Sequence, residues 1–389
     1  MILRAKWVLP VSAPPIENGA VTVEGDSIVA VGPATGEGRD LGEVVLAPGL
    51  INAHCHFDYS HLQGKVPFHG SFADWLMLLV ELKKQQTEAD YLAGIQAGIE
   101  QALAAGTTTV VNIASVPNLI PQLPATPLKI IWCEELIDLF REEPAEKLVE
   151  AALQRPGIGG LSPHAPYTAS PELYRLAARH ARGRHWVFTT HLAESEEEDD
   201  MFRRGTGHMY DSFRRAGRDM ADCKRVGPVQ LLRECEVLTP ECLVAHANCL
   251  TELDMMLLQA TGTPVAHCPQ THRFFRRGMP LIERLQHAGV NVCLGSDSLA
   301  SGESLSMFAQ MQELSREFPR WSAEQILPLA TTNAAKALQR AGKLGEISVG
   351  AVADLIAVPL AGNFDPYEAV VFAEQPVSFM MINGNVVRE

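Results

Sequence analysis

Eight apolar, strand-like runs alternate with helical patterns through the middle of the chain. The runs cover residues 44–54, 107–115, 128–136, 157–166, 186–194, 242–250, 264–272 and 291–300. Helical patterns separate most of them, for example over residues 90–105, 144–154, 171–182 and 281–288. Repeated strand-then-helix units of this kind predict a distorted (β/α)8 barrel, in which catalytic side chains lie at the carboxyl ends of the strands.

The two ends of the chain show a different pattern. Four β-prone stretches cover residues 20–24, 27–31, 353–358 and 377–382. The last of them leads into Asn383-Gly384, a pair that is a strong signal for a hairpin turn. We therefore expect residues 1–48 and 345–389 to form one small β-sandwich domain, and residues 49–344 to form the barrel.

Composition sets broad limits on the class of protein. The 389 residues are 47% hydrophobic and 20% charged, which indicates a globular chain, and the net charge of −14 offers no basic field for nucleic acid. Eight cysteines without a CxxC pair are expected to be buried free thiols. The apolar run before Pro10 is too short for a signal peptide, and no run approaches the roughly 20 residues that cross a bilayer. These features predict a cytoplasmic protein that binds a small molecule and neither nucleic acid nor a membrane.

Polar side chains recur at the far ends of the predicted barrel strands. They are His54, His56, His164, His191, Glu194, His246, His267, His272 and Asp297. His54 and His56 are two apart on an extended strand, so both face the same side. With His191 and Asp297 they would form a three-nitrogen, one-oxygen set that suits zinc and leaves one position for water. The alternative, core histidines satisfied by hydrogen bonds, would need a coincidence at four strand ends.

Two further residues are candidates for proton transfer. His246 could be a fifth metal ligand, a base beside the metal-bound water or a structural histidine, and we favour the base because four ligands suffice. Glu194 lies three residues after His191, where burial would raise the pKa of its carboxyl group and favour the protonated form. It also begins an acidic run, so a solvated surface glutamate is the alternative.

Taken in order, these motifs resemble those of the amidohydrolase superfamily. The matching segments are Pro48-Gly-Leu-Ile-Asn-Ala-His-Cys-His56, His191-Leu-Ala-Glu194, His246, Gly295-Ser-Asp297 and residues 345–355. The resemblance implies a barrel enzyme with one or two metal ions. Its binuclear branch typically has a bridging lysine in the fourth strand, and residues 157–166 contain none, so one ion per subunit is expected. That ion is expected to be Zn²⁺, with Fe²⁺ as the alternative, in a homodimer, because family members are often dimers.

Residues 162–167 and the His-Leu-Ala-Glu motif resemble one branch of this superfamily more than others. That branch contains the adenosylhomocysteine, methylthioadenosine, guanine and aminodeoxyfutalosine deaminases together with triazine hydrolases. The loop 57–64, which contains Ser60, and the Phe72-Ala-Asp-Trp75 segment look most like the aminodeoxyfutalosine deaminases of menaquinone biosynthesis. We therefore predict a hydrolytic deaminase of 6-amino-6-deoxyfutalosine. The alternatives are another deaminase of the branch, a triazine-type chlorohydrolase, a cyclic amide hydrolase and a non-catalytic scaffold.

The resemblance also suggests roles for individual side chains. In the expected reaction Glu194 protonates a ring nitrogen, while His246 and Asp297 take the proton of a zinc-activated water, and Asp297 then delivers a proton to the leaving amine.

The predicted substrate carries a benzoate group, for which Arg273 is the candidate clamp because a guanidinium binds carboxylate through two hydrogen bonds. The alternative for Arg273 is a solvated loop position. His164, Trp75 and Ser60 are the other predicted substrate contacts, although Trp75 could equally be a core tryptophan. Residues 201–226 could contribute to a lid, in which His208 packs or faces solvent.

Overall fold

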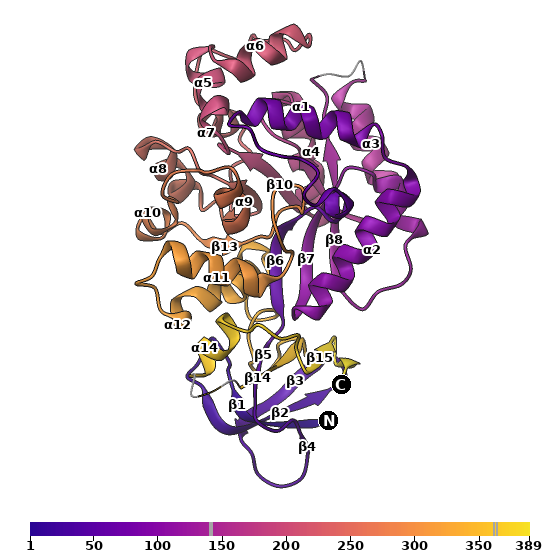
Figure 1. The fold of residues 1–389 in the computed structure, drawn as a ribbon, viewed down its shortest axis with the longest axis vertical. Coiled ribbons are helices and arrows are strands. Elements are labelled where there is room, and N and C mark those ends of the chain that lie inside the picture. Colours follow the sequence, from indigo (N-terminus) through magenta and orange to yellow (C-terminus); the bar gives the residue numbers. More distant parts are fainter. Residues whose placement is uncertain (140–142, 361, 363–364) are drawn as a thin grey trace.

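The computed structural model describes residues 1–139, 143–360, 362 and 365–389, and contains two eight-stranded sheets (Figure 1). One sheet is parallel and runs in chain order. Its strands are β6 (Leu50–Cys55), β7 (Thr107–Ala114), β8 (Lys129–Leu136), β9 (Ile158–Pro163), β10 (Val187–Leu192), β11 (Cys242–His246), β12 (Val265–His267) and β13 (Val292–Leu294). Seven of them fall inside predicted runs and β6 extends one residue beyond its run, so the distorted (β/α)8 barrel is confirmed.

Helices follow most of these strands and cover the outside of the barrel (Figure 1). They are α1 (Phe72–Lys83), α2 (Glu88–Ala104), α3 (Ala145–Gln154), α4 (Pro171–Arg184), α5 (Glu196–Arg204), α6 (His208–Arg215), α7 (Pro228–Glu234), α8 (Glu252–Thr261), α9 (Pro269–Phe274), α10 (Ile282–His287), α11 (Met307–Glu317), α12 (Ala323–Ile326), α13 (Thr332–Ala337) and α14 (Pro366–Val371). Three 3₁₀ helices are η1 (Phe57–Leu62), η2 (Pro117–Gln122) and η3 (Leu327–Ala330). Capping residues fix where several begin: Thr87 and Asp90 form a capping box at the start of α2.

The barrel closes where the segment after β13 meets β6. The backbone N–H groups of Ser296 and Asp297 both donate to the carbonyl oxygen of His54, at 3.0 Å each. A side chain at Gly295 would place its Cβ atom 2.8 Å from the Cβ atom of His54, so glycine permits this close approach. The seam therefore brings His54 and Asp297, which are far apart in the chain, to the same place.

The second sheet is built from both ends of the chain and lies at the opposite end of the molecule from α1 and α6 (Figure 1). Its strands are β1 (Ile2–Val8), β2 (Ile16–Glu24), β3 (Ser27–Pro33), β4 (Arg39–Asp40), β5 (Val44–Pro48), β14 (Leu355–Pro359), β15 (Phe379–Ile382) and β16 (Asn385–Arg388). Asn383 and Gly384 both have positive φ, 49° and 73°, and turn the chain between β15 and β16 as predicted. The small β unit formed by both termini is confirmed, and its exact boundaries stay a prediction.

Residues 44–54, predicted as one run, form two strands in different sheets. β5 pairs with β14 in the terminal sheet, and β6 pairs with β7 in the barrel. Gly49 separates them, and a Cβ atom at this position would lie only 2.2 Å from the hydroxyl oxygen of Thr108. The chain can therefore pass from one sheet to the other only with a residue that has no side chain at the crossing.

All eight cysteines are free; seven are buried and Cys249 is half-buried. In the part of the chain that the structure describes, every helix is too short or too polar to span a lipid bilayer.

Candidate active site

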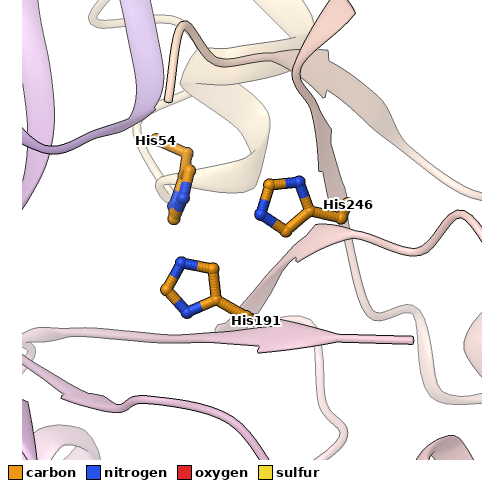
Figure 2. A group of neighbouring side chains, drawn as sticks. All are labelled: His54, His191 and His246. Atoms are coloured by element: carbon orange, nitrogen blue, oxygen red, sulfur yellow. The ribbon is translucent and has the colours of Figure 1, made fainter. Parts of the chain in front are cut away.

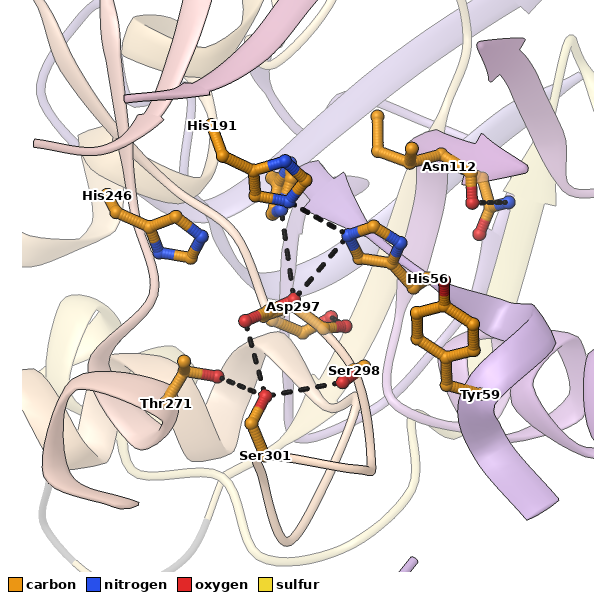
Figure 3. A network of polar contacts seen from close by, with 12 residues as sticks. His56, Tyr59, Asn112, His191, His246, Thr271, Asp297, Ser298 and Ser301 are labelled. Carbon is orange, nitrogen blue, oxygen red and sulfur yellow. Dashed lines mark hydrogen bonds and ion pairs between the residues drawn. The ribbon is translucent and has the colours of Figure 1, made fainter. Parts of the chain in front are cut away.

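The four predicted metal ligands lie together at the carboxyl-end mouth of the barrel. Figure 3 labels His56, His191 and Asp297, and Figure 2 labels His54. His54 and His56 come from the end of β6, His191 from β10 and Asp297 from the segment after β13. The Nε2 atoms of His56 and His191 are 3.2 Å apart. Asp297 Oδ1 lies 3.8 Å from His54 Nε2 and 3.7 Å from His56 Nε2. These atoms surround a common point, as the strand-end pattern predicted.

His246, at the end of β11, belongs to the same cluster (Figure 2). Ligand atoms of His54, His191 and His246 lie within 4.8 Å of one another, as do those of His54, His56 and Asp297. The two groups share His54. The Nε2 atom of His246 is also 3.8 Å from Oε2 of Glu194. The geometry therefore accommodates His246 as a fifth ligand or as a base beside the other four.

The protonation states of these histidines fit a metal site. Burial lowers the pKa values of His54, His56 and His246 well below the usual range, which favours the neutral imidazole that can donate a lone pair. His191 Nδ1 lies 2.7 Å from the carbonyl oxygen of His164. A proton on Nδ1 would donate to that carbonyl and leave the lone pair of Nε2 facing the cluster.

Unpartnered nitrogen atoms provide a separate test of whether this cluster fits a metal ion. Both ring nitrogens of His54 and the Nδ1 atom of His56 are buried and have no hydrogen-bond partner among the residues that the structure describes. Buried polar atoms are normally paired, and an unpaired group in a native site needs an explanation. Together with the carboxylate of Asp297, this donor set fits a divalent cation, which would satisfy the nitrogens that face it.

Hydroxyl groups hold the carboxylate of Asp297 from the side away from the histidines (Figure 3). Its Oδ2 atom accepts a hydrogen bond from Ser301 at 3.3 Å, and Ser301 is itself linked to Thr271 at 3.1 Å and Ser298 at 3.2 Å. Burial raises the pKa of Asp297, while the charge of His191 and the hydroxyl groups oppose the rise. A carboxylate whose pKa is raised in this way is suited to accept and release a proton.

Backbone strain marks three strand ends at this mouth. Ala193, His246 and Asp297 have φ values of 49°, 74° and 57°, in the region that favours glycine. Such conformations cost free energy and occur preferentially at functional sites. Each of these residues ends or shortly follows a barrel strand, so the positive φ turns the chain where the site residues are presented.

Glu194 is buried beside the cluster, with 5% of its surface exposed, which excludes the alternative of a solvated surface residue. Its backbone N–H donates to the Glu198 carboxylate at 2.8 Å, and its carbonyl oxygen accepts from the side-chain amide of Asn248 at 3.2 Å. Burial raises the pKa of Glu194 well above its usual range, and the charge of Asp297 adds to the rise. The protonated form is therefore favoured, as a general acid requires.

A cavity of about 50 Å³ opens onto the cluster. It is lined by His56, Tyr59, Phe72, Trp75, Leu76, Leu79, Glu135, His164, Tyr167, His191, Glu194, His246, Phe275, Asp297 and Ser298. Small-molecule sites usually measure about 300–1,000 Å³, so substrate entry requires the covering side chains to move. α1 forms part of the cover, and the Glu197 carboxylate accepts hydrogen bonds from the backbone N–H groups of Phe72 (2.6 Å) and Ala73 (3.3 Å).

The structure brings some of the predicted substrate-binding residues to this cavity and not others. His164 and Trp75 line it. Ser60 is buried in η1 and faces α2, because a Cβ atom at Gly98 would lie 2.8 Å from its hydroxyl oxygen. His208 is exposed and pairs with Asp74 of α1 at 2.6 Å, so it is one of the two outcomes expected for it, a histidine that faces solvent.

Arg273 is also placed away from the cavity. Its guanidinium forms ion pairs with Glu303 at 2.9 Å and with Glu313 at 3.1 Å, and 47% of its side chain is exposed. It lines a neighbouring surface hollow with Gln270 and Phe274 instead. The prediction that Arg273 clamps a substrate carboxylate is not supported, since two glutamates of the protein already occupy its hydrogen-bonding groups.

Tyr59 and Glu135 are among the cavity residues that were not predicted from the sequence. Tyr59 stacks on the ring of His56 with centroids 5.2 Å apart, and its hydroxyl accepts a hydrogen bond from Lys83 at 2.8 Å. Glu135 lies near the end of β8 and lines the cavity. The strand-end rule that identified the histidines also applies to the acidic pair Glu134-Glu135 and could have found the latter.

Comparison with known proteins identifies the family of the chain. The model of the amidohydrolase family matches residues 45–387. The 5-methylthioadenosine/S-adenosylhomocysteine deaminase of Syntrophobacter fumaroxidans is 28% identical over 410 residues, covering 96% of this chain and 89% of that protein. Two solved structures share the fold. Helicobacter pylori aminofutalosine deaminase in complex with methylthio-coformycin has a TM-score of 0.85 at 22% identity, covering 99% of each chain. A zinc-bound adenosine deaminase of Xanthomonas campestris has a TM-score of 0.82 at 23% identity, covering 100% of this chain and 92% of that one.

These findings confirm the enzyme class predicted from the motifs, a hydrolytic deaminase with a histidine-rich metal site. The family match extends over both the barrel and most of the terminal sheet. The chain belongs to the amidohydrolase family.

Proposed function

We propose that this protein is a zinc-dependent deaminase of an adenosine-type nucleoside, and that its substrate is 6-amino-6-deoxyfutalosine. The observation that carries the proposal is the position of Glu194. Its buried carboxyl group, which favours the protonated form, lies in one cavity with the metal-ligand cluster and 3.8 Å from His246. An acid beside a metal-activated water is what hydrolysis of a ring amidine requires.

Each side chain has a separate task in this reaction. A divalent ion held by the four-ligand cluster would lower the pKa of a water toward 7 and supply the nucleophile. Glu194 donates a proton to the ring nitrogen next to the reacting carbon and so makes that carbon electrophilic. Asp297 and His246 orient the water and take its proton. Asp297 then passes a proton to the amino group, which leaves as ammonia.

The donor set supports zinc as the ion. Three imidazole nitrogens and one carboxylate oxygen are typical zinc ligands. The structural neighbour from Xanthomonas campestris contains zinc.

Two observations bear on the substrate. The segment from Phe72 to Trp75, which resembles that of aminodeoxyfutalosine deaminases, forms an aromatic wall of the cavity with Phe275. Aromatic walls of this kind stack on the flat rings of a substrate. The second candidate is 5'-methylthioadenosine or S-adenosylhomocysteine, and it is favoured by the relatives named for these substrates.

A panel of substrates tests the proposal. Ammonia release by zinc-loaded protein would be measured with 6-amino-6-deoxyfutalosine, S-adenosylhomocysteine, 5'-methylthioadenosine, adenosine and guanine side by side. We expect the highest kcat/KM with 6-amino-6-deoxyfutalosine and loss of activity when the metal is removed by a chelator. A higher kcat/KM with one of the adenosine compounds would correct the substrate. No ammonia from any of them, or full activity after complete metal removal, would overturn the proposal.

A further inference from the structure

Arg277 lies behind the aromatic wall of the cavity, in the segment that follows α9. Its guanidinium carbon is 5.2 Å from the ring centroid of Phe72 and 5.1 Å from that of Phe275. Both rings line the cavity. The guanidinium is therefore held by cation–π contacts with two side chains that a bound substrate would touch.

Two nitrogen atoms of the Arg277 guanidinium lack a hydrogen-bond partner among the described residues. Its Nε and Nη2 atoms are shielded from solvent and have no hydrogen-bond partner among the described residues. These two nitrogens form one edge of the planar guanidinium, and that edge matches the two oxygens of a carboxylate. Shielding a charged donor from solvent without a partner costs free energy, so we expect an acceptor group of a ligand to bind this edge during the reaction.

Two other arginines of the chain have guanidinium groups that are bound by carboxylates of the protein itself. Arg218 is buried and binds both carboxylate oxygens of Asp222 at 2.8 Å each. Arg273, four residues before Arg277, is paired with Glu303 and Glu313. Among the described residues, Arg277 forms no such ion pair with a carboxylate. Its charge nevertheless acts on Glu194: burial and the charge of Asp297 raise the pKa of that carboxyl group, and the guanidinium of Arg277 lowers it. A cation near the reacting groups with no carboxylate of its own is suited to bind one from a ligand.

We propose that Arg277 binds a carboxylate of the substrate, at the end of the molecule remote from the reacting carbon–nitrogen bond. The inner part of the cavity holds the metal ligands and Glu194, which leaves the wall formed by Phe72 and Phe275 for the remote end. Arg277 is outside the cavity lining, so contact with the carboxylate requires Phe72, the first residue of α1, to move aside on substrate entry. This inference rests on the proposed function and makes Arg277 the residue that selects carboxylate-bearing nucleosides over uncharged ones.

A matched pair of substrates tests this role. Deamination of 6-amino-6-deoxyfutalosine, which carries a benzoate, would be compared with that of its methyl ester in the wild type, Arg277→Gln and Arg277→Lys. We expect Arg277→Gln to lower kcat/KM for the acid about 10- to 100-fold, mainly through KM, because a charge-assisted pair is lost. The ester should be little affected. Arg277→Lys should recover only part of the loss, because an ammonium cannot bind both oxygens through one rigid edge.

Arg276→Gln is the control, because Arg276 is the exposed neighbour on the same segment and a surface charge should change kcat/KM by no more than about twofold. Equal losses for the acid and the ester in Arg277→Gln would assign Arg277 a purely structural role and overturn the inference.

Calorimetry with benzoate separates the two proposals. Zinc-loaded wild type should bind benzoate more tightly than Arg277→Gln. If no nucleoside is deaminated but this difference is found, the proposed function fails and the carboxylate site stands. If nucleosides are deaminated but benzoate binds both proteins equally and the acid and ester respond alike, the carboxylate site fails and the deaminase function stands.

Discussion

Two buried aspartates lie at opposite ends of the barrel and have opposite surroundings. Asp354, just before β14, forms an ion pair with Lys129 of β8, and its Oδ1 atom accepts the backbone N–H of Asn383 at 2.9 Å. Asp297 has Ser301 as a hydrogen-bond donor, and His54 and His56 lie nearly 4 Å away.

The difference shows which end of the barrel serves stability and which serves chemistry. The carboxylate of Asp354 is paired with a lysine that the barrel supplies, so it joins the terminal sheet to the barrel. His54 and His56 are neutral because burial lowers the pKa values of their rings, so these two provide no positive charge. A divalent cation held between them and Asp297 would provide the counter-charge that Lys129 provides for Asp354.

The largest effect is expected from Asp297→Asn. The change preserves the shape of the side chain but removes a negative ligand and a proton carrier at once. We expect kcat/KM for deamination to fall about 10⁴-fold, the upper end for a general acid–base residue, and the zinc content to fall with it. Ammonia release and metal analysis of the purified variant measure both. A variant with normal zinc content and normal activity would show that Asp297 is neither a metal ligand nor a proton carrier, which would contradict the proposed difference from Asp354.

Glu194→Gln should produce the next largest loss. Glutamine cannot deliver a proton to a ring nitrogen, so we expect kcat/KM to fall about 10³-fold. Zinc content should be unchanged, because Glu194 is outside both ligand groups of the cluster. This split between activity and metal content distinguishes Glu194 from Asp297. Near-normal deamination by the variant would show that another group protonates the ring.

The positions of the metal-ligand residues could be predicted from the sequence because they depend on regular local patterns. The two-residue period of a strand places His54 and His56 on one face, and the alternation of strands and helices brings the strand ends to one rim. The runs that contain His191 and Asp297 could therefore be assigned to the site without knowledge of their contacts.

Side-chain direction after a strand or helix could not be predicted in the same way. Arg273, Arg276 and Arg277 are equivalent in the sequence, but Glu303 and Glu313, some 30–40 residues later, bind the first of them. Arg276 has a φ of 52°, which turns the chain so that Arg277 reaches the aromatic wall. The directions of these arginine side chains therefore depend on long-range ion pairs and on a single backbone angle.

Asp354→Asn tests whether the ion pair between Asp354 and Lys129 stabilises the fold. Removing one partner of this partly buried ion pair leaves Lys129 without its counter-charge, so we expect the free energy of unfolding to fall by about 2–3 kcal/mol. Urea unfolding followed by circular dichroism measures this loss. The folded variant should keep the kcat/KM and zinc content of the wild type. The double variant with Lys129→Met should lose less than the sum of the single changes, and additive losses would contradict a direct pair.

The smallest effect is expected from a third carboxylate, the half-buried Glu317 near His267. Its Oε2 atom has no hydrogen-bond partner among the described residues and lies 3.9 Å from Nε2 of His267. Burial raises the pKa of Glu317 to about 7 and lowers the pKa of His267 to about 3, so the imidazole is uncharged at neutral pH.

Because the carboxyl group of Glu317 holds its proton more tightly in the folded chain than in the unfolded chain, stability falls as the pH rises from about 4.5 to about 7. Its contribution to that fall is about 2 kcal/mol after allowance for partial exposure. Glu317→Gln should remove this contribution and leave deamination nearly unchanged, since Glu317 is outside the cavity lining. Urea unfolding of both proteins across this pH range provides the measurement. A difference in stability that does not vary with pH would show that Glu317 is already paired, like Asp354.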